Sequence, residues 1–502
     1  MIDLILQGFL HAMQIGNVLA MVFGTLIGIL FGALPGFTAT MGVAVFIPFS
    51  FWLPPATALL LISGVYCGAI YGGSISAVLI GIPGTPASVP TTFDGFVMTK
   101  RGEAGKALGL VTYASAVGGF LSSLALLLGA PVLAAFALKF GPPEQITLAL
   151  FGLSVVCMLT AENLLKGLLV GAVSLLLATI GQDPMEGYPR YTFGMIGLIG
   201  GLPLVPVLIG LFSLPEVFNI LEGELHKSEI PKIGSMRVGF REALHHWKLT
   251  LKSSLIGIFI GIIPAAGPDI AAFISYNEAM RSSKNRHLFG KGNPEGIIAS
   301  EAANNGVTGG SLIPLLTLSI PGSAPAAVFL GALFIHGLRP GPTLFTKNAD
   351  IVYALLVGFA LINILMYFLG IGFCKLASSV VKAPRYILVP IIITLTVVGS
   401  YAVQQTFFDV GVMFTAGLVG WIMQRNGFPA SPVALGLILG PLLEQAIDMS
   451  LVMFNNNLLK IFTRPLAVLF LIFTILSLAW PYVAKKLTPK IEILPNEKEE
   501  GT

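Results

Sequence analysis

Residues 71–94 read YGGSISAVLIGIPGTPASVPTTFD, and residues 308–328 repeat this pattern as TGGSLIPLLTLSIPGSAPAAV. Each stretch has a GGS triplet, an apolar run, an Ile-Pro-Gly turn, and then small and hydroxyl residues. Gly and Pro interrupt helices and free backbone groups that lipid cannot hydrogen-bond. We therefore expect both the GGS triplets and the turns to break membrane helices. Paired breaks in the two halves of an apolar chain indicate a transport site.

The composition is that of a membrane protein. The chain has 502 residues, of which 55% are hydrophobic and 10% are charged, and its net charge of +4 gives no reason to expect a nucleic-acid partner. The three cysteines, Cys67, Cys157 and Cys374, lie far apart without metal-ligand spacing. We therefore expect neither a disulfide framework nor a transition-metal site, and no cofactor. The predicted fold class is an all-α polytopic membrane protein with roughly 11 to 12 spans.

The chain contains an internal repeat. Residues 26–35 read LIGILFGALP, and residues 255–264 read LIGIFIGIIP. In each half of the chain this LIG motif comes before the GGS triplet, so the two halves share two motifs in the same order. Two ordered matches indicate a duplication. The resulting domain prediction is a first transmembrane repeat at 1–221, a cytoplasmic linker at 222–249, a second transmembrane repeat at 250–485 and a cytoplasmic C-terminal tail at 486–502.

The distribution of charge predicts that the two copies are inverted. The segment 48–55 of the first copy has no basic residue, whereas its counterpart in the second copy carries Arg281, Lys284, Arg286 and Lys291. Positive charge stays on the cytoplasmic side, so these two loops are expected on opposite sides of the membrane. The N-terminus is then outside and the C-terminus inside. Within the first copy, the short segments 17–34 and 37–52 predict a re-entrant hairpin.

Polar residues concentrate in the second copy. Glu301, Asn304, Asn305 and Thr308 share one helical face, and Asp269 lies in the turn that ends the second LIG motif. Burying such groups in an apolar membrane helix costs free energy, so their presence indicates an ion or substrate site. The alternative is that they form hydrogen bonds between helices. Asp94 has the further alternative of capping a helix.

Three segments resemble a known family. They are residues 81–109 (GIPGTPASVPTTFDGFVMTKRGEAGKALG), 264–273 (PAAGPDIAAF) and 300–342 (SEAANNGVTGGSLIPLLTLSIPGSAPAAVFLGALFIHGLRPGP). They resemble the large membrane subunit of bacterial tripartite tricarboxylate transporters, the TctA family. The resemblance implies a permease of the cell inner membrane that works with a small four-helix membrane subunit (TctB-like) and a periplasmic solute-binding protein (TctC-like). It also implies sodium-coupled uptake of citrate or related carboxylates.

The broken helices indicate a mechanism of their own. Helix N-termini hold anions through free N–H groups, while freed carbonyls and Asn or Thr oxygens coordinate a cation, either sodium or, as the alternative coupling species, a proton. The predicted substrate-binding residues are Thr38, Gly73, Ser74, Gly84, Thr85, Gly310, Ser311, Gly322 and Ser323. The predicted sodium-binding residues are Pro35, Gly36, Asp269, Asn304, Asn305 and Thr308, with Asp94 and Glu301 in support.

Other readings stay open at this point. The substrate could be a dicarboxylate or an aromatic acid, and a channel would use similar broken helices. A membrane-embedded hydrolase would need a nucleophile and a base, or a pair of carboxylates. Asp94 and Asp269 are the candidates for such a pair. The chain has no HExxH or GxSxG motif, so we predict that it is not an enzyme.

Overall fold

The computed structural model describes residues 2–160, 163–183, 187–222, 245–380 and 385–487, most of them helical. Within this part of the chain, eight helices are long and apolar enough to cross a membrane, and six shorter apolar helices accompany them. This confirms the all-α polytopic class. Of the expected linker, residues 223–244 lie outside the described residues, as do residues 488–502 of the expected C-terminal tail.

The first repeat is built as follows: α1 (Ile2–Ala12), α2 (Ile15–Ala33), α3 (Ala39–Ser50), α4 (Pro55–Ile80), η1 (Pro86–Ser88), α5 (Val89–Lys100), α6 (Ala104–Ala137), α7 (Pro142–Thr160), α8 (Leu164–Ala178), β1 (Gly181–Gln182), β2 (Pro189–Arg190), η2 (Ile196–Leu198) and α9 (Leu204–Glu222). The two short strands pair antiparallel.

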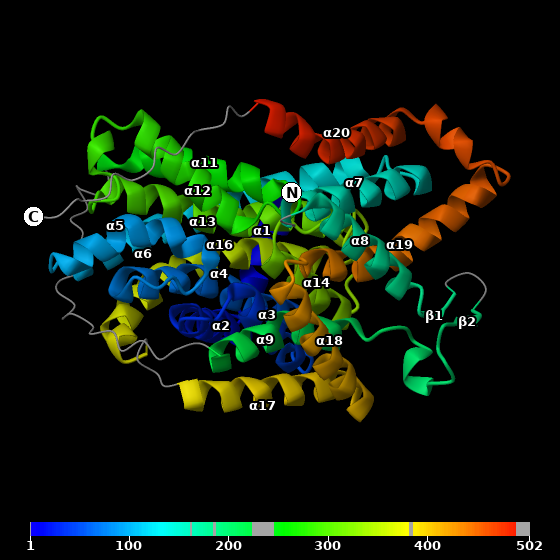
Figure 1. Cartoon of the computed structure of the whole chain (residues 1–502), viewed down its shortest axis with the longest axis horizontal. Helices are drawn as coiled ribbons and strands as arrows, with labels where there is room; N and C mark the ends of the chain where they lie inside the picture. Colours follow the sequence, from blue (N-terminus) through cyan, green and yellow to red (C-terminus); the bar gives the residue numbers. More distant parts are fainter. Residues whose placement is uncertain (1, 161–162, 184–186, 223–244, 381–384, 488–502) are drawn as a thin grey trace, which may run out of the picture.

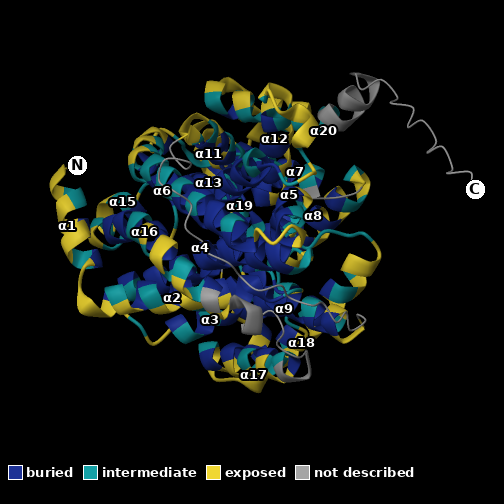
Figure 2. Ribbon diagram, turned by 90° about the vertical axis from the view of Figure 1, so that its left-hand side faces the viewer, coloured by how far each residue is buried: buried dark blue, intermediate teal, exposed yellow. Residues whose placement is uncertain are grey.

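The second repeat follows with α11 (Trp247–Ile262), α12 (Gly267–Ser282), η3 (Arg286–Leu288), α13 (Pro294–Leu318), α14 (Ala324–Ile335), α15 (Leu344–Lys347), α16 (Ala349–Val380), α17 (Arg385–Gln404), α18 (Phe407–Arg425), α19 (Ser431–Met453), η4 (Leu458–Thr463) and α20 (Pro465–Leu487). The central helices α4 and α13 lie in the buried middle of the molecule (Figure 2).

The prediction that the GGS triplets break the helices is wrong. Both α4 and α13 run through their triplets without interruption, and each ends only just before its Ile-Pro-Gly turn. The glycines permit close packing instead: a Cβ on Gly72 would collide with the Ile29 carbonyl, and one on Gly309 would collide with the Ser122 carbonyl. Small residues at such positions let two membrane helices approach closely.

After each turn the chain folds back along the helix it has just left. Gly84 N donates to Gly73 O at 3.0 Å in the first copy, and Gly322 N donates to Ser311 O at 3.4 Å in the second. The next helix, α5 or α14, then begins beside the middle of the preceding one. We call residues 81–88 the first tip and residues 319–323 the second tip.

The packing of each tip repeats in the two copies. A Cβ on Gly84 would collide with the carbonyl of Gly32, and a Cβ on Gly322 would collide with the carbonyl of Gly261. Gly32 and Gly261 occupy the same position of the LIG motifs. The duplication read in the sequence is therefore present in the packing, since equivalent residues make equivalent contacts.

The two central helices run antiparallel. Tyr66 of α4 bonds to Ser311 of α13, whereas Ser74, further along α4, bonds to Glu301, which is earlier in α13. The helices next to them show the same inversion. α3 of the first copy and α14 of the second end at the same side of the molecule, where Ser50 and His336 lie 3.3 Å apart. The end of α5 instead lies beside the basic α12–α13 loop, where a Cβ on Gly292 would meet Met98 and Arg101. From the middle of α5, Asp94 accepts from Gly292 N at 2.8 Å. Equivalent helices thus end on opposite sides, as the charge pattern predicts.

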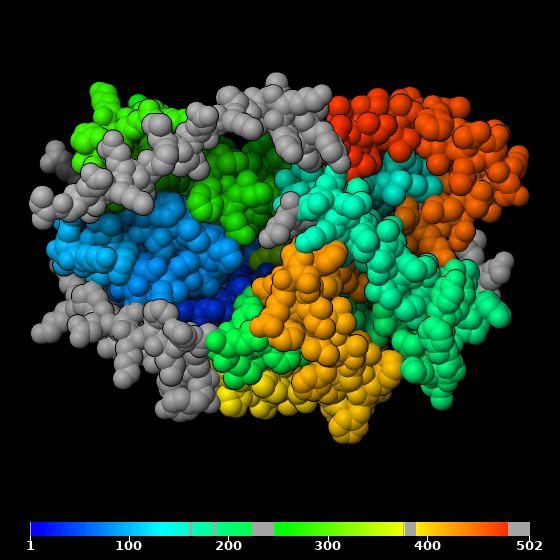
Figure 3. All heavy atoms as spheres, in the orientation of Figure 1, coloured from blue at the N-terminus to red at the C-terminus, as the bar shows by residue number. Residues whose placement is uncertain are grey.

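We call the end of the molecule with the α12–α13 loop the basic end and the opposite one the far end. The β1–β2 hairpin lies at the far end, opposite α5 and α12 (Figure 1). The remaining helices of the two repeats pack reciprocally, α9 on α18 and α8 on α19. On one face, the surface of α5 and α6 (blue) lies beside that of α18 (orange) (Figure 3).

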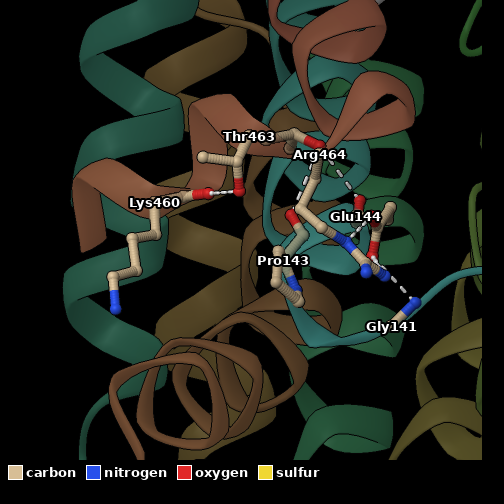
Figure 4. Close-up of polar contacts among 7 residues, drawn as sticks. Gly141, Pro143, Glu144, Lys460, Thr463 and Arg464 are labelled. Carbon is tan, nitrogen blue, oxygen red and sulfur yellow. Dashed lines mark hydrogen bonds and ion pairs between the residues drawn. The ribbon is translucent and has the colours of Figure 1, made fainter. Parts of the chain in front are cut away.

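An ion pair holds the start of the last helix against the body. Arg464, just before α20, donates from Nε to Glu144 Oε1 at 2.8 Å, and Gly141 N donates to Glu144 Oε2 at 2.9 Å (Figure 4). Glu144 is only 2% exposed and lies in the first turn of α7. The pair fixes the start of α20 against the start of α7, on which α20 packs.

Candidate functional site

A cavity of about 480 Å³ lies where the breaks of both copies meet. Four segments that start helices line it: 38–40 before and in α3, 85–87 at the first tip, 265–270 before and in α12, and 324–325 at the start of α14. The wall is completed by α9, by the end of α18 and by residues 428–431. One cavity is thus shared by the first tip, by the start of α14 directly after the second tip, and by both re-entrant turns.

The helix starts give this cavity a positive electrostatic character. Each helix N-terminus carries roughly half a positive charge and has free N–H groups, so it attracts anions. Thr38 and Ser323 cap α3 and α14 by accepting from Met41 N at 3.1 Å and Ala326 N at 3.3 Å. Among the described residues that line the cavity, none is Lys, Arg or His, and the acids are Glu216 and Asp269. The cavity can therefore take an anion on backbone groups and a cation beside the carboxylates.

The predicted substrate residues of the first copy divide into two groups. Thr38 and Thr85 line the cavity. Ser74 lies behind the tip, where its hydroxyl donates to Glu301 Oε1 at 2.6 Å. The N–H of Gly84 is used within the tip by the Gly73 carbonyl, so these two glycines shape the tip and have no free donor there.

The predicted substrate residues of the second copy surround the second tip. Ser311 and Ser323 each lie 3.0 Å from the hydroxyl of Tyr66, which comes from the first copy. Gly322 N is used by Ser311 O, and a Cβ on Gly310 would press on the Ile258 carbonyl. Each GGS serine is therefore held by a side chain of the other copy, Ser311 by Tyr66 and Ser74 by Glu301.

The predicted sodium residues do not form one cluster. Asp269 lines the cavity in the first turn of α12. Pro35 and Gly36 form the turn between α2 and α3, where Gly36 has a φ of +86° that favours glycine. The other three, Asn304, Asn305 and Thr308, lie inside α13 and are not among the residues that line the cavity.

The two supporting carboxylates hold elements together. Asp94 accepts from Gly292 N, from Asn293 N at 2.7 Å and from the Tyr276 hydroxyl at 2.8 Å, so it fixes the loop that begins α13. The capping alternative raised from the sequence does not describe this role, because the side chain that caps α13 is Asn293, which accepts from Glu295 N at 3.0 Å.

Glu301 is fully buried and accepts from three hydroxyls, those of Ser74, Thr91 and, at 3.0 Å, Ser115. It joins α13 to α4, α5 and α6. Asp94 and Glu301 therefore act at the two ends of the same contact between the copies.

Sequence reasoning missed three residues at the site. Glu216 of α9 and Gln424 of α18 line the cavity, and Tyr66 bridges to the second tip. A signal existed for Glu216, because it is a carboxylate inside an apolar run, and such groups mark functional sites. Tyr66 and Gln424 carried no signal, since their positions relative to the breaks depend on tertiary packing.

Comparison with known proteins assigns the chain to a family of membrane transporters. The model of the tripartite tricarboxylate transporter TctA family matches residues 18–435, which contain both LIG motifs and both tips. No solved structure matches the chain.

Two relatives come from Agrobacterium vitis. One, described as an uncharacterized 52.8 kDa protein in the TAR-I ttuC' 3'region, is 34% identical over 444 residues, which cover 86% of this chain and 87% of the relative. The other, described as an uncharacterized protein in the TAR-II ttuC' 3'region, is 31% identical over 211 residues, 42% of this chain and 87% of the relative. With the family model spanning both repeats and the cavity between them, this multi-pass membrane protein belongs to the TctA family of tripartite tricarboxylate transporters.

Proposed function

We propose that the chain is the permease subunit of a secondary active transporter that takes up a citrate-like or other tricarboxylate anion together with sodium. The observation that supports this most directly is the convergence of four helix starts on one cavity without a basic side chain among its described lining residues. A polycarboxylate needs positive potential, and here only backbone N–H groups and helix dipoles can supply it. The volume of about 480 Å³ is within the range of small-molecule sites.

Hydroxyl groups at the helix starts would complete the anion site. Thr38 and Thr85 line the cavity from opposite turns of the first copy, and Ser323 caps the helix that begins there in the second copy. Their O–H groups can donate to carboxylate oxygens, and hydrogen bonds to a charged acceptor are the stronger kind.

The carboxylates of the cavity supply a reason for cation coupling. Glu216 and Asp269 would repel a polycarboxylate at short range, and a bound sodium ion would offset that repulsion. Each ligand would then raise the affinity for the other by the same factor, as thermodynamic linkage requires. Proton coupling would work through the same two acids, so the ion has to be identified by experiment.

The family supports a tripartite assembly in the cell inner membrane. We propose a small four-helix membrane subunit and a periplasmic solute-binding protein as the partners. The solute-binding protein would deliver the anion to the far end, because positive charge marks the basic end as cytoplasmic.

The test is uptake into proteoliposomes that contain this chain and its two partner subunits. Labelled citrate, a dicarboxylate and an aromatic acid would be compared with and without an inward sodium gradient. We expect saturable citrate uptake that stops when choline replaces sodium. Uptake of only the dicarboxylate or the aromatic acid would change the substrate, and non-saturable flux that ignores the gradient would indicate a channel.

A further inference from the structure

A second polar cluster lies inside the buried bundle of α4, α6, α13 and α16. Its members contact one another in series from α13 through α6 and α16 to α4. Ser122 of α6 lies 3.5 Å from the Thr308 hydroxyl, and its own hydroxyl donates to Gly119 O at 2.8 Å. The Asn363 Oδ1 atom lies against Gly119, and the Nδ2 atom is 4.0 Å from the sulfur of Cys67. Cys67 therefore brings α4 into the cluster beside Asn363.

Amide oxygens of this region have no hydrogen-bond partner. The Oδ1 atoms of Asn304, Asn305 and Asn363 have no hydrogen-bond partner, and all three side chains are 0% exposed. The Asn304 amide also lies near the Glu301 carboxylate. Buried polar groups in proteins almost always have partners, so several unpaired amide oxygens on neighbouring helices need a bound species to explain them.

The chemistry of these atoms selects the species. Amide and hydroxyl oxygens are neutral hard ligands, which suit alkali and alkaline-earth cations rather than transition metals. One carboxylate, Glu301, lies one helical turn from Asn304 and Asn305 on the same face of α13. A single negative charge in a dry bundle balances a single positive charge.

The geometry points to an occluded monovalent-cation site, sodium being the species expected, formed by Asn304, Asn305, Thr308 and Asn363. It is separate from the open cavity, and Asn363 of α16 is a ligand that the sequence did not suggest. The site would hold a second sodium ion besides the one proposed next to Glu216 and Asp269 in the cavity, so as a coupling site it rests on the proposed function. Glu301 would transmit occupancy, because it also accepts hydrogen bonds from Ser74 and Thr91 beside the first tip.

The experiment measures sodium-dependent thermal stability of the purified full-length protein without any carboxylate. A ligand that binds the folded state raises the melting temperature with its concentration. We expect sodium chloride to raise it above potassium or choline chloride at equal ionic strength. Asn363→Ala and Asn304→Ala should each raise the half-saturating sodium concentration at least about tenfold.

The matched control is Asn17→Ala. Asn17 is also a buried asparagine, but it donates to His11 O at 2.7 Å and accepts from Thr57 at 2.6 Å, so its amide is satisfied. Its removal should lower the melting temperature and leave the sodium response intact. If Asn363→Ala does not fold, Gly119→Ala serves instead, because a Cβ there displaces the Asn363 oxygen.

Two results would overturn the site. One is a melting temperature that does not distinguish sodium from choline, which would mean that the cluster holds only water. The other is a half-saturating sodium concentration that neither asparagine variant changes when the cavity site has been removed by Asp269→Asn. Neither result bears on carboxylate uptake. Conversely, if citrate is not taken up, a sodium response of the purified protein still has to come from this site or from the cavity. Asp269→Asn removes a carboxylate from the cavity only, so it distinguishes between the two.

Discussion

Among single residues, Glu216 decides most about the cavity. It is contributed by α9, a helix that carries neither of the breaks, and it lines the same cavity as the starts of four helices. A carboxylate there lowers the positive potential that those helix starts create. Its presence makes sense if a cation accompanies the anion, because the cation then bridges the two opposing charges.

Replacing this carboxylate by an amide tests that role. Glu216→Gln should weaken the sodium dependence of uptake and raise the half-saturating sodium concentration about tenfold, because it removes one charge from the cation's surroundings. The measurement is initial uptake rate against sodium concentration in proteoliposomes.

The matched control is Glu222→Gln on the same helix. Glu222 pairs with Arg425 at the surface, and exposed pairs contribute little. Unchanged sodium dependence in Glu216→Gln, or an equal change in both variants, would show that Glu216 does not face the ion.

At the scale of elements, Gly84 and Gly322 give the tips space, while Gly81, with a φ of +71°, gives the first tip its left-handed backbone. Gly84 and Gly322 lie against the carbonyls of Gly32 and Gly261, so each tip can fold back only where no side chain intervenes. The close contact places the starts of α5 and α14 beside the middle of α4 and α13. This position is what brings the helix starts into the cavity.

A single methyl group at either tip should therefore be costly. Gly84→Ala and Gly322→Ala should each lower stability by about 1–3 kcal/mol and reduce uptake, because overpacking forces the tip away from the preceding helix. The melting temperature and the uptake rate would be measured together. Gly411→Ala in α18 is the control: it meets nothing within 4 Å, and alanine is the better helix former. Tip variants as stable and active as this control would contradict the packing argument.

For the whole molecule, inversion of the two copies is what makes one site out of two breaks. Antiparallel α4 and α13 bring the tips together from opposite sides, and each copy contributes a side chain, Tyr66 or Glu301, to the other's GGS serine. Parallel copies would carry their breaks to different faces of the bundle. The shared cavity is therefore a consequence of topology and not of any one segment.

The orientation can be checked from the two sides of a membrane. Lys284→Cys, at the basic end, should react with a membrane-impermeant maleimide only from the cytoplasmic side, and Tyr188→Cys, at the far end, only from outside. Both positions are exposed, and the native cysteines are buried and should react slowly. The assay compares right-side-out with inverted vesicles. Labelling of both positions from the same side would refute the inverted arrangement.

By itself, the sequence determined the class of protein, the duplication, the inversion and the two turns, because these follow from hydropathy, repeated motifs and the sidedness of charge. It also identified Asp269, Thr38 and Thr85, which line the cavity. Only the tertiary structure decided that the GGS glycines pack helices, and that Glu216, Tyr66 and Asn363 belong beside residues far away in the chain. The physical reason is that local patterns specify where a helix ends, whereas contacts between helices depend on how two antiparallel copies fit together.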